Sequence, residues 1–199
     1  VDFHALGATA LSFAAHKFHG PRGIGGLLLK QGTVLQPLLF GGHQEAGRRA
    51  GTECGSLAAG MAHALKLWHE QRDARHKQLT QLRDRLQSTL EQQCAPTVAH
   101  AATVPRLPNT LNIAFPGVDG EALLVALDLA GVAASLGSAC ASGSTEPSPI
   151  LVAMGCPADV YRSSLRLSLS AANSAEEIDR AAAIIVETVA RLRNSGQHP

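Results

Sequence analysis

The sequence lacks the features of nucleic-acid-binding, membrane-spanning and disulfide-rich proteins. Its 17 basic and 16 acidic residues leave a formal charge of +1, so no basic surface for nucleic acid is expected. No apolar run approaches the ~20 residues that cross a bilayer, and the first residues lack the pattern of a secretory signal. The nine histidines are scattered, and the four cysteines form no C-x-x-C pair. These absences argue against a structural metal site and favour reduced thiols in the cytoplasm.

Apolar patterns predict strands and helices that alternate along the chain. Residues 9–13 and 24–29 are predicted as strands, and the second is apolar enough to lie inside a sheet. Leucines at intervals of three and four predict a long helix over 56–93. We expect this helix to link two domains and to bend or bridge solvent in its charged middle, 70–77.

The second half of the chain follows the same alternation after a proline-rich connector at 95–108. Ser174 and Glu177 have the spacing of a capping box, and apolar residues after them predict a final helix with one buried stripe. The other expected elements are strands at 110–115, 132–135 and 163–170 and helices at 120–129 and 149–154. The class is therefore α/β, with expected divisions at 1–60, 61–95 and 96–199.

A first candidate for chemistry is Lys17, in the run SFAAHKFHGPRG at 12–23. An amine that attacks carbonyl groups needs a fixed place at the end of a strand, partial desolvation and small neighbours. Ala14, Ala15 and the glycines that follow are small, and His16 lies next to the lysine. Lys17 could therefore form a Schiff base, and the alternative is an ordinary exposed lysine.

A second candidate is Cys140, in the run GSACASGSTEPS at 137–148. A cysteine in a hydrophobic core usually has apolar neighbours at strand or helix spacing. Cys140 instead lies in a polar segment punctuated by glycine, where a thiolate could meet solvent or substrate. The alternative is a small buried cysteine without a chemical role.

Four separated parts of the chain, in matching order, resemble the cysteine desulfurases, a family of pyridoxal-phosphate (PLP) enzymes that take sulfur from L-cysteine. The likeness is to the branch that supplies iron–sulfur cluster assembly. It implies the C-terminal part of the large domain of a fold-type I PLP transferase followed by a small α/β domain. The sequence would then begin in mid-fold, as a C-terminal half. The matching segments are SFAAHKFHGPRGIGGLLL at 12–29, GGHQEAGRRAGTE at 41–53, PNTLNIAF at 108–115, and LGSACASGSTEPS at 136–148 with SSLRLSLS at 163–170.

The resemblance implies cofactor-binding roles for the first two segments. Lys17 would hold PLP through its amine and move the substrate's alpha proton, and His16 would help to place the cofactor and share in proton transfer. The backbone amides of Ala14 and Ala15 would meet the phosphate, although the family commonly has a serine hydroxyl where Ala14 stands. Thr52 would reach the phosphate bound by the other subunit, which implies a homodimer.

The same resemblance assigns the substrate and sulfur steps. Arg166 would receive the carboxylate of L-cysteine, and Cys140 would accept the sulfur as a persulfide in a mobile loop. Cys140 would then pass the sulfur to a scaffold or another acceptor protein, and could transiently ligate a [2Fe-2S] cluster. The cysteines at 54, 94 and 156 match no family role and are predicted to be structural.

Two further interpretations stay open. Another PLP reaction, such as selenocysteine lysis or transamination, would need Lys17 without needing Cys140. The chain could also be a truncated piece that is not catalytic and serves as an interaction module. An isolated C-terminal half would expose apolar strands such as 24–29, and we expect it to be poorly soluble.

Overall fold

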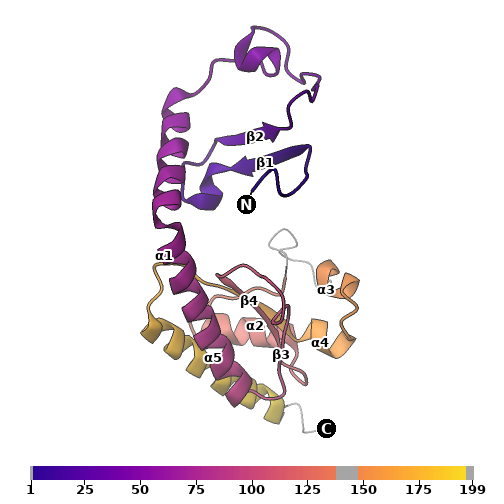
Figure 1. Cartoon of the computed structure of the whole chain (residues 1–199). Helices are drawn as coiled ribbons and strands as arrows, with labels where there is room; N and C mark the ends of the chain where they lie inside the picture. The colour runs from indigo at the N-terminus through magenta and orange to yellow at the C-terminus, as the bar shows by residue number, and fades with distance from the viewer. Residues whose placement is uncertain (1, 138–147, 196–199) are drawn as a thin grey trace. The chain divides into compact units, whose positions relative to one another are not determined.

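The computed structural model describes residues 2–137 and 148–195 and contains two compact units, Val1–Arg72 and Asp73–Pro199 (Figure 1). We describe each unit by itself. The boundary between them falls within one long helix, α1 (Gly55–Gln93). In the described ranges, no helix combines the length and the apolar character needed to cross a membrane.

The first unit is built on an antiparallel hairpin of β1 (Ala10–Ala14) and β2 (Gly25–Leu29), with Phe13 opposite Gly26. A Cβ atom on Gly26 would lie 2.3 Å from the Phe13 ring, so the ring needs a glycine across from it. The hairpin lies beside the N-terminal half of α1 (Figure 1), where a Cβ on Gly60 would be 3.2 Å from Pro21. Close contact between small residues thus sets the turn after β1 against the helix.

The faces of this hairpin are only partly covered. Leu27 is 51% exposed and Leu28 is 44% exposed. We predicted that this strand would be buried inside a sheet, and that prediction is wrong for the described residues because β2 pairs with β1 alone among them. The hairpin is linked to α1 by a segment that contains the 3-10 helix η2 (Gln44–Gly47).

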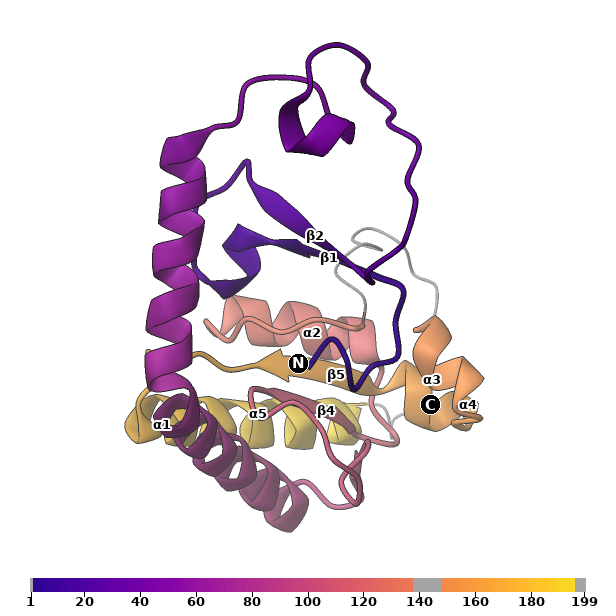
Figure 2. The ribbon, with the colours of Figure 1, turned by 45° about the horizontal axis from the view of Figure 1, so that its top comes forward.

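The second unit is a three-stranded antiparallel sheet in the order β3 (Val98–Ala99), β4 (Thr110–Ala114) and β5 (Ser164–Ser168). Side chains alternate along these strands, so the leucines of β5 share one face of the sheet. Helices α1, α2 (Gly120–Leu129) and α5 (Ala175–Ser195) contribute to the core against this face, and Figure 2 shows α5 running alongside β4 and β5. The fully buried strand residues are Leu111, Ile113, Ala114 and Leu165.

The helix predictions for the second unit are confirmed. α2 spans Gly120–Leu129 as expected, and α3 (Pro149–Ala153) occupies most of the predicted short helix. The capping box is formed at the start of α5, where the Glu177 amide donates to Ser174 Oγ at 3.2 Å and the Ser174 amide donates to the Glu177 carboxylate at 3.0 Å. The predicted apolar stripe of α5 is buried, at Ile178, Ala182, Ile185 and Val189.

Two local predictions are wrong, and one short helix was not predicted. Residues 132–135 form no strand, because the Val132 amide bonds to the Leu127 carbonyl at the end of α2, and only Ser135 makes a β-bridge, to Arg166. The connector at 95–108 contains the short strand β3. Helix α4 (Ala158–Arg162) was not expected, since five residues are too few to show a helical apolar period.

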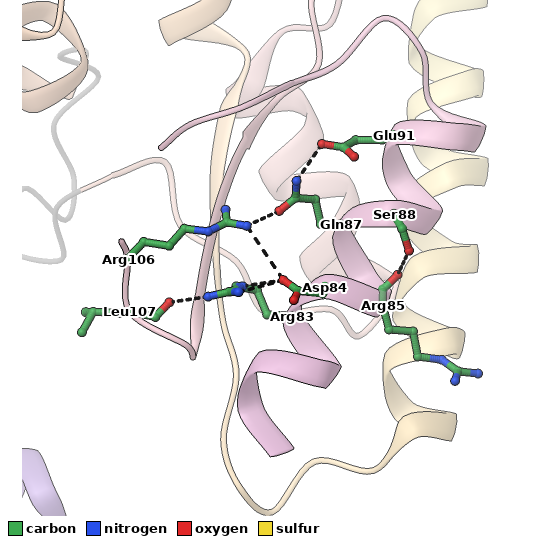
Figure 3. Close-up of polar contacts among 8 residues, drawn as sticks. All are labelled: Arg83, Asp84, Arg85, Gln87, Ser88, Glu91, Arg106 and Leu107. Atoms are coloured by element: carbon green, nitrogen blue, oxygen red, sulfur yellow. Dashed lines mark hydrogen bonds and ion pairs between the residues drawn. The ribbon is translucent and has the colours of Figure 1, made fainter. Parts of the chain in front are cut away.

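A polar cluster on α1 fixes the loop that leads into β4 (Figure 3). The Arg83 side chain donates to the Leu107 carbonyl at 3.0 Å and to Asp84 at 2.8 Å, and Arg83 is only 8% exposed. Arg106 donates to Gln87, which itself donates to Glu91 at 2.8 Å. These contacts hold the start of β4 in place and so help to set the strand that pairs with β5.

Candidate functional site

Lys17 lies in a tight turn at the end of β1. The 3-10 helix η1 (Ala15–Phe18) follows the strand directly and carries both His16 and Lys17. His19 closes the helix with a φ of 66°, and the Gly20 amide donates to the Ala15 carbonyl at 2.9 Å. A Cβ on Gly20 would lie 2.9 Å from that of Ala15, so a glycine is needed to close the turn. The sequence order of alanine, lysine and glycine therefore fixes where the amine emerges.

Both side chains of the expected pair face solvent. His16 and Lys17 are exposed, whereas the sequence led us to expect a partly desolvated lysine. An exposed amine on a short, constrained turn is free to meet a carbonyl group. Any desolvation would have to come from atoms that cover this turn.

The two alanines before the lysine differ in what their amides can bind. The Ala15 amide donates to the Ile24 carbonyl at 3.1 Å, and Ala15 is fully buried. The expectation that this amide binds a phosphate disagrees with the structure. In an antiparallel ladder, every second residue of a strand forms hydrogen bonds to its partner strand. The bonds of Ala15 with Ile24 and of Thr9 with Lys30 show that the odd-numbered residues of β1 bond to β2. The Ala14 amide therefore points to the edge of β1 that pairs with no strand among the described residues, where a phosphate oxygen could bind.

Thr52 lies apart from this turn in the sequence, between η2 and α1, and is exposed. The Gly51 amide before it donates to the Gln44 side chain at 3.2 Å, and Gly51 has a φ of 116°, which favours glycine. The predicted role of Thr52 at a phosphate of another subunit stays a prediction.

Cys54, which we predicted to be structural, is exposed immediately before α1. Its sulfur lies 3.5 Å from Ser56 Oγ. Hydrogen bonds from the Ser56 side chain and the Leu57 amide lower the pKa of the Cys54 thiol. The sequence could have indicated this lowered pKa, because it places Cys54 at the start of a predicted helix.

Arg166 occupies the middle of β5 in the second unit, on the face opposite the core leucines. It pairs in register with Asn112 of β4, and its Nη1 donates to the Gly137 carbonyl. Backbone bonds in both directions join Arg166 to Ser135. The Arg166 Nε and Asn112 Oδ1 atoms are buried without a hydrogen-bond partner among the described residues. Among the described residues, the guanidinium is thus bonded from one side and keeps donors for a further partner, as carboxylate binding requires.

The segment that contains Cys140 begins and ends near Arg166. Cys140 itself lies outside the described residues. A Cβ on Gly137 would be 3.1 Å from the Ser148 Cβ, so the two described ends of the segment approach each other.

A second group of reactive side chains, not expected from the sequence, lies on the same sheet face. His100 Nε2 is 2.9 Å from Ser164 Oγ, and His100 Nδ1 is 3.8 Å from Cys156 Sγ. Burial lowers the pKa of the His100 imidazole. His100 lies 56 residues before Cys156 and 64 residues before Ser164, and the pairing of β3, β4 and β5 brings it to them.

Comparisons with known proteins agree on one family. Residues 1–181 match the family model of aminotransferase class V. The chain is 45% identical over 185 residues to a cysteine desulfurase of Trichormus azollae, covering 92% of this chain and 46% of that protein. It is 43% identical over 198 residues to the cysteine desulfurase NifS of Azotobacter vinelandii, covering 98% of this chain and 48% of that protein.

Solved structures give the same result. A NifS-like protein superposes with a TM-score of 0.80 at 31% identity, covering 96% of this chain and 49% of that chain. The expected α/β class is therefore confirmed. The chain spans about half the length of the curated relatives that it matches.

Proposed function

Because this chain belongs to the aminotransferase class-V family, we propose that the protein to which it contributes is a cysteine desulfurase. The reaction is L-cysteine plus the Cys140 thiol giving L-alanine plus a Cys140 persulfide. The Cβ–S bond of cysteine breaks, a sulfur–sulfur bond forms, and the thiol proton balances the hydrogen gained by alanine. The names of the matching relatives support this reaction.

The residues of the first unit fit a PLP cofactor in part. Lys17 would hold it, and His16 and the outward amide of Ala14 would bind or orient it, while the Ala15 amide is already bonded to Ile24. When bound, PLP supplies an acceptor for the electron pair left on the alpha carbon of the substrate when that carbon loses its proton. Lys17 and His16 would move protons at the substrate carbon, since both carry exposed nitrogen atoms on one short turn.

One observation carries the proposal: the hydrogen bond from Arg166 to the Gly137 carbonyl. Arg166 would receive the substrate carboxylate through its remaining donors. The same arginine then anchors the start of the segment with the sulfur-accepting Cys140. Cys140 follows Gly137 by only three residues, so carboxylate binding at Arg166 and sulfur transfer at Cys140 would take place close together.

The partners follow from the same proposal. Thr52 would complete the phosphate site of a second copy, so the protein would be a homodimer. The persulfide would be delivered to a scaffold or other acceptor protein for iron–sulfur cluster assembly, and Cys140 could ligate a [2Fe-2S] cluster during delivery.

The test uses Cys140→Ser in the full-length protein. We expect persulfide and sulfide formation from L-cysteine to be lost while the PLP absorbance band stays, and Lys17→Ala to abolish that band. Cys54→Ser, which changes an exposed cysteine, is the matched control and should keep sulfide formation. Persulfide formation that survives in Cys140→Ser would refute the proposal. A keto acid as the product, in place of alanine and sulfide, would indicate transamination.

A further inference from the structure

The group formed by Cys156, His100 and Ser164 has the geometry of a thiol with its own base. All three lie in the second unit and within the described residues. Ser164 Oγ donates its proton to the Val160 carbonyl at 2.8 Å, so it can only accept from His100 Nε2 at 2.9 Å. The ring proton is therefore on Nε2. In the neutral ring, Nδ1 carries a lone pair, and this lone pair faces the Cys156 sulfur at 3.8 Å.

The surroundings keep the ring fixed and neutral. His100 is 9% exposed and Ser164 is 1% exposed, and the His100 amide donates to the Asn112 carbonyl at 2.9 Å. Burial lowers the pKa of the imidazole, so it is uncharged near neutral pH and can accept a proton. The other ionisable side chains on the elements packed around it are Asp159, Tyr161 and Arg162 in α4 and Arg166 in β5.

Cys156 is accessible enough to react. It is half-buried, in the turn between α3 and α4, and its amide donates to the Leu151 carbonyl at 3.1 Å. Cys94 offers a contrast, because it is 2% exposed and burial raises the pKa of its thiol. A nucleophile, a base within reach and a third group that orients the base are the parts of an activated thiol.

We propose that Cys156 is a second reactive thiol, activated by His100, which undergoes exchange with low-molecular-weight disulfides. The Cys156 sulfur attacks one sulfur of the disulfide R–S–S–R while its proton passes to His100 Nδ1. A bond from Cys156 to S–R forms, the S–S bond of the reagent breaks, and RSH leaves after taking up that proton. Cys156 is oxidised to a mixed disulfide and one half of the reagent is reduced to a thiol. This activity does not depend on the proposed desulfurase reaction.

The test measures exchange of 2-hydroxyethyl disulfide with the full-length protein between pH 6.5 and pH 8.5. Fragment-ion mass spectrometry assigns the adduct to Cys156. We expect wild-type Cys156 to react at a rate that changes little over this range, because His100 takes the proton. Cys94 should stay unmodified, which reports that the fold is intact.

The decisive variant is His100→Gln, whose side-chain amide can still donate to Ser164 but offers no base. We expect its exchange rate at pH 6.5 to fall at least about tenfold and then to rise steeply with pH, since a positioned base typically contributes ~10²-fold or more. Ser164→Ala, which keeps the base but not its orientation, should show a smaller loss. Equal rates and equal pH profiles in wild type and His100→Gln would overturn the proposal, as would a wild-type Cys156 that does not react.

Discussion

The hydrogen bonding of Arg166 makes it possible to test the role of the planar guanidinium apart from the role of the positive charge. One nitrogen of the guanidinium donates to the Gly137 carbonyl, while Nε is buried with no partner among the described residues. A lysine at this position would keep the positive charge. It would lose the planar arrangement of donors that matches two carboxylate oxygens.

We therefore expect Arg166→Lys in the full-length protein to raise the KM for L-cysteine by about tenfold or more, because bidentate binding is lost. Steady-state alanine production measures this. Arg162→Lys, which changes an exposed arginine of α4, is the control and should keep the KM. A KM that stays at the wild-type value in Arg166→Lys would remove Arg166 from the substrate site.

Sequence reasoning could identify the residues of the Lys17 turn but not the direction of their amides. The run of small residues around Lys17 predicted a turn after a strand, and η1 confirms a turn there. The Ala15 amide points to Ile24 because of the phase of the β1–β2 ladder. That phase depends on which strand pairs with β1 and in which register, and composition does not reveal it. The contact of His100 with Cys156 depends in the same way on the pairing of β3 with β4, which composition does not reveal either.

Helix α5 depends on the capping box at its start. Ser174 Oγ accepts from the Glu177 amide, and the Glu177 carboxylate accepts from the Ser174 amide and from Asn173. We expect Ser174→Ala to destabilise the first turn of α5 by about 1 kcal/mol. Hydrogen exchange of that turn should quicken about fivefold, while Ser195→Ala at the other end of α5 should leave it unchanged.

The same box gives an acid dependence with a defined sign. Hydrogen bonds from the Ser174 amide and then the Asn173 side chain lower the pKa of Glu177. The ionised Glu177 carboxylate therefore stabilises the first turn of α5 fully above the pKa of the unfolded state. This stabilisation is lost as the pH falls through the lower pKa of the folded state. The protection factors of the first-turn amides, which divide out the slower intrinsic exchange in acid, should fall on acidification more in wild type than in Glu177→Gln. Equal acid sensitivity in the two proteins would contradict this assignment.

Arg193 joins the end of α1 to α5. Its side chain donates to the carbonyls of Cys94 and Ala95 at 2.7 and 2.9 Å, and to those of Pro96 and Pro116 at 2.7 and 3.2 Å. We expect Arg193→Lys to lower the free energy of unfolding by about 1–3 kcal/mol, because an ammonium cannot reach all four carbonyls. Thermal unfolding measures it, with the exposed Arg191→Lys as control. Equal melting temperatures would show that the charge alone suffices.

Long periodic elements were predictable, and short ones were not. The leucine spacing of α1 and the stripe of α5 each repeat over several turns, so single exceptions do not hide the period. α4 has five residues and β3 has two, and both depend on neighbours that are distant in sequence. Residues 132–135 have the composition of a strand, but hydrogen bonds to the end of α2 prevent it.

At the scale of the whole molecule, the first unit leaves much apolar surface in solvent. The segment after β2 is the most exposed, with Val34 at 90%, Leu38 at 93% and Phe40 at 84%. Exposed patches of this kind are usually covered by other protein surface. The chain spans about half of its curated relatives, so such surface is available in proteins of that length.

We therefore expect the 199-residue chain, expressed alone, to self-associate, while the full-length protein stays in one defined state. Size-exclusion chromatography with light scattering measures this. Replacing Leu38 and Phe40 by serine in the chain should reduce the association, because it removes two of the most exposed apolar side chains. A stable monomer of the unmodified chain would contradict the expectation.

Helix α1 has 39 residues and contributes to both units, with the boundary between them inside it. A cut at that boundary would leave about four unbonded carbonyls on one piece and four unbonded amides on the other. Exchange of one unit between related genes would meet the same difficulty. Chimaeras between related proteins should therefore keep α1 intact when they are joined before Gly55 or after Gln93. Chimaeras joined at Arg72, inside the helix, should be retained less often in evolution.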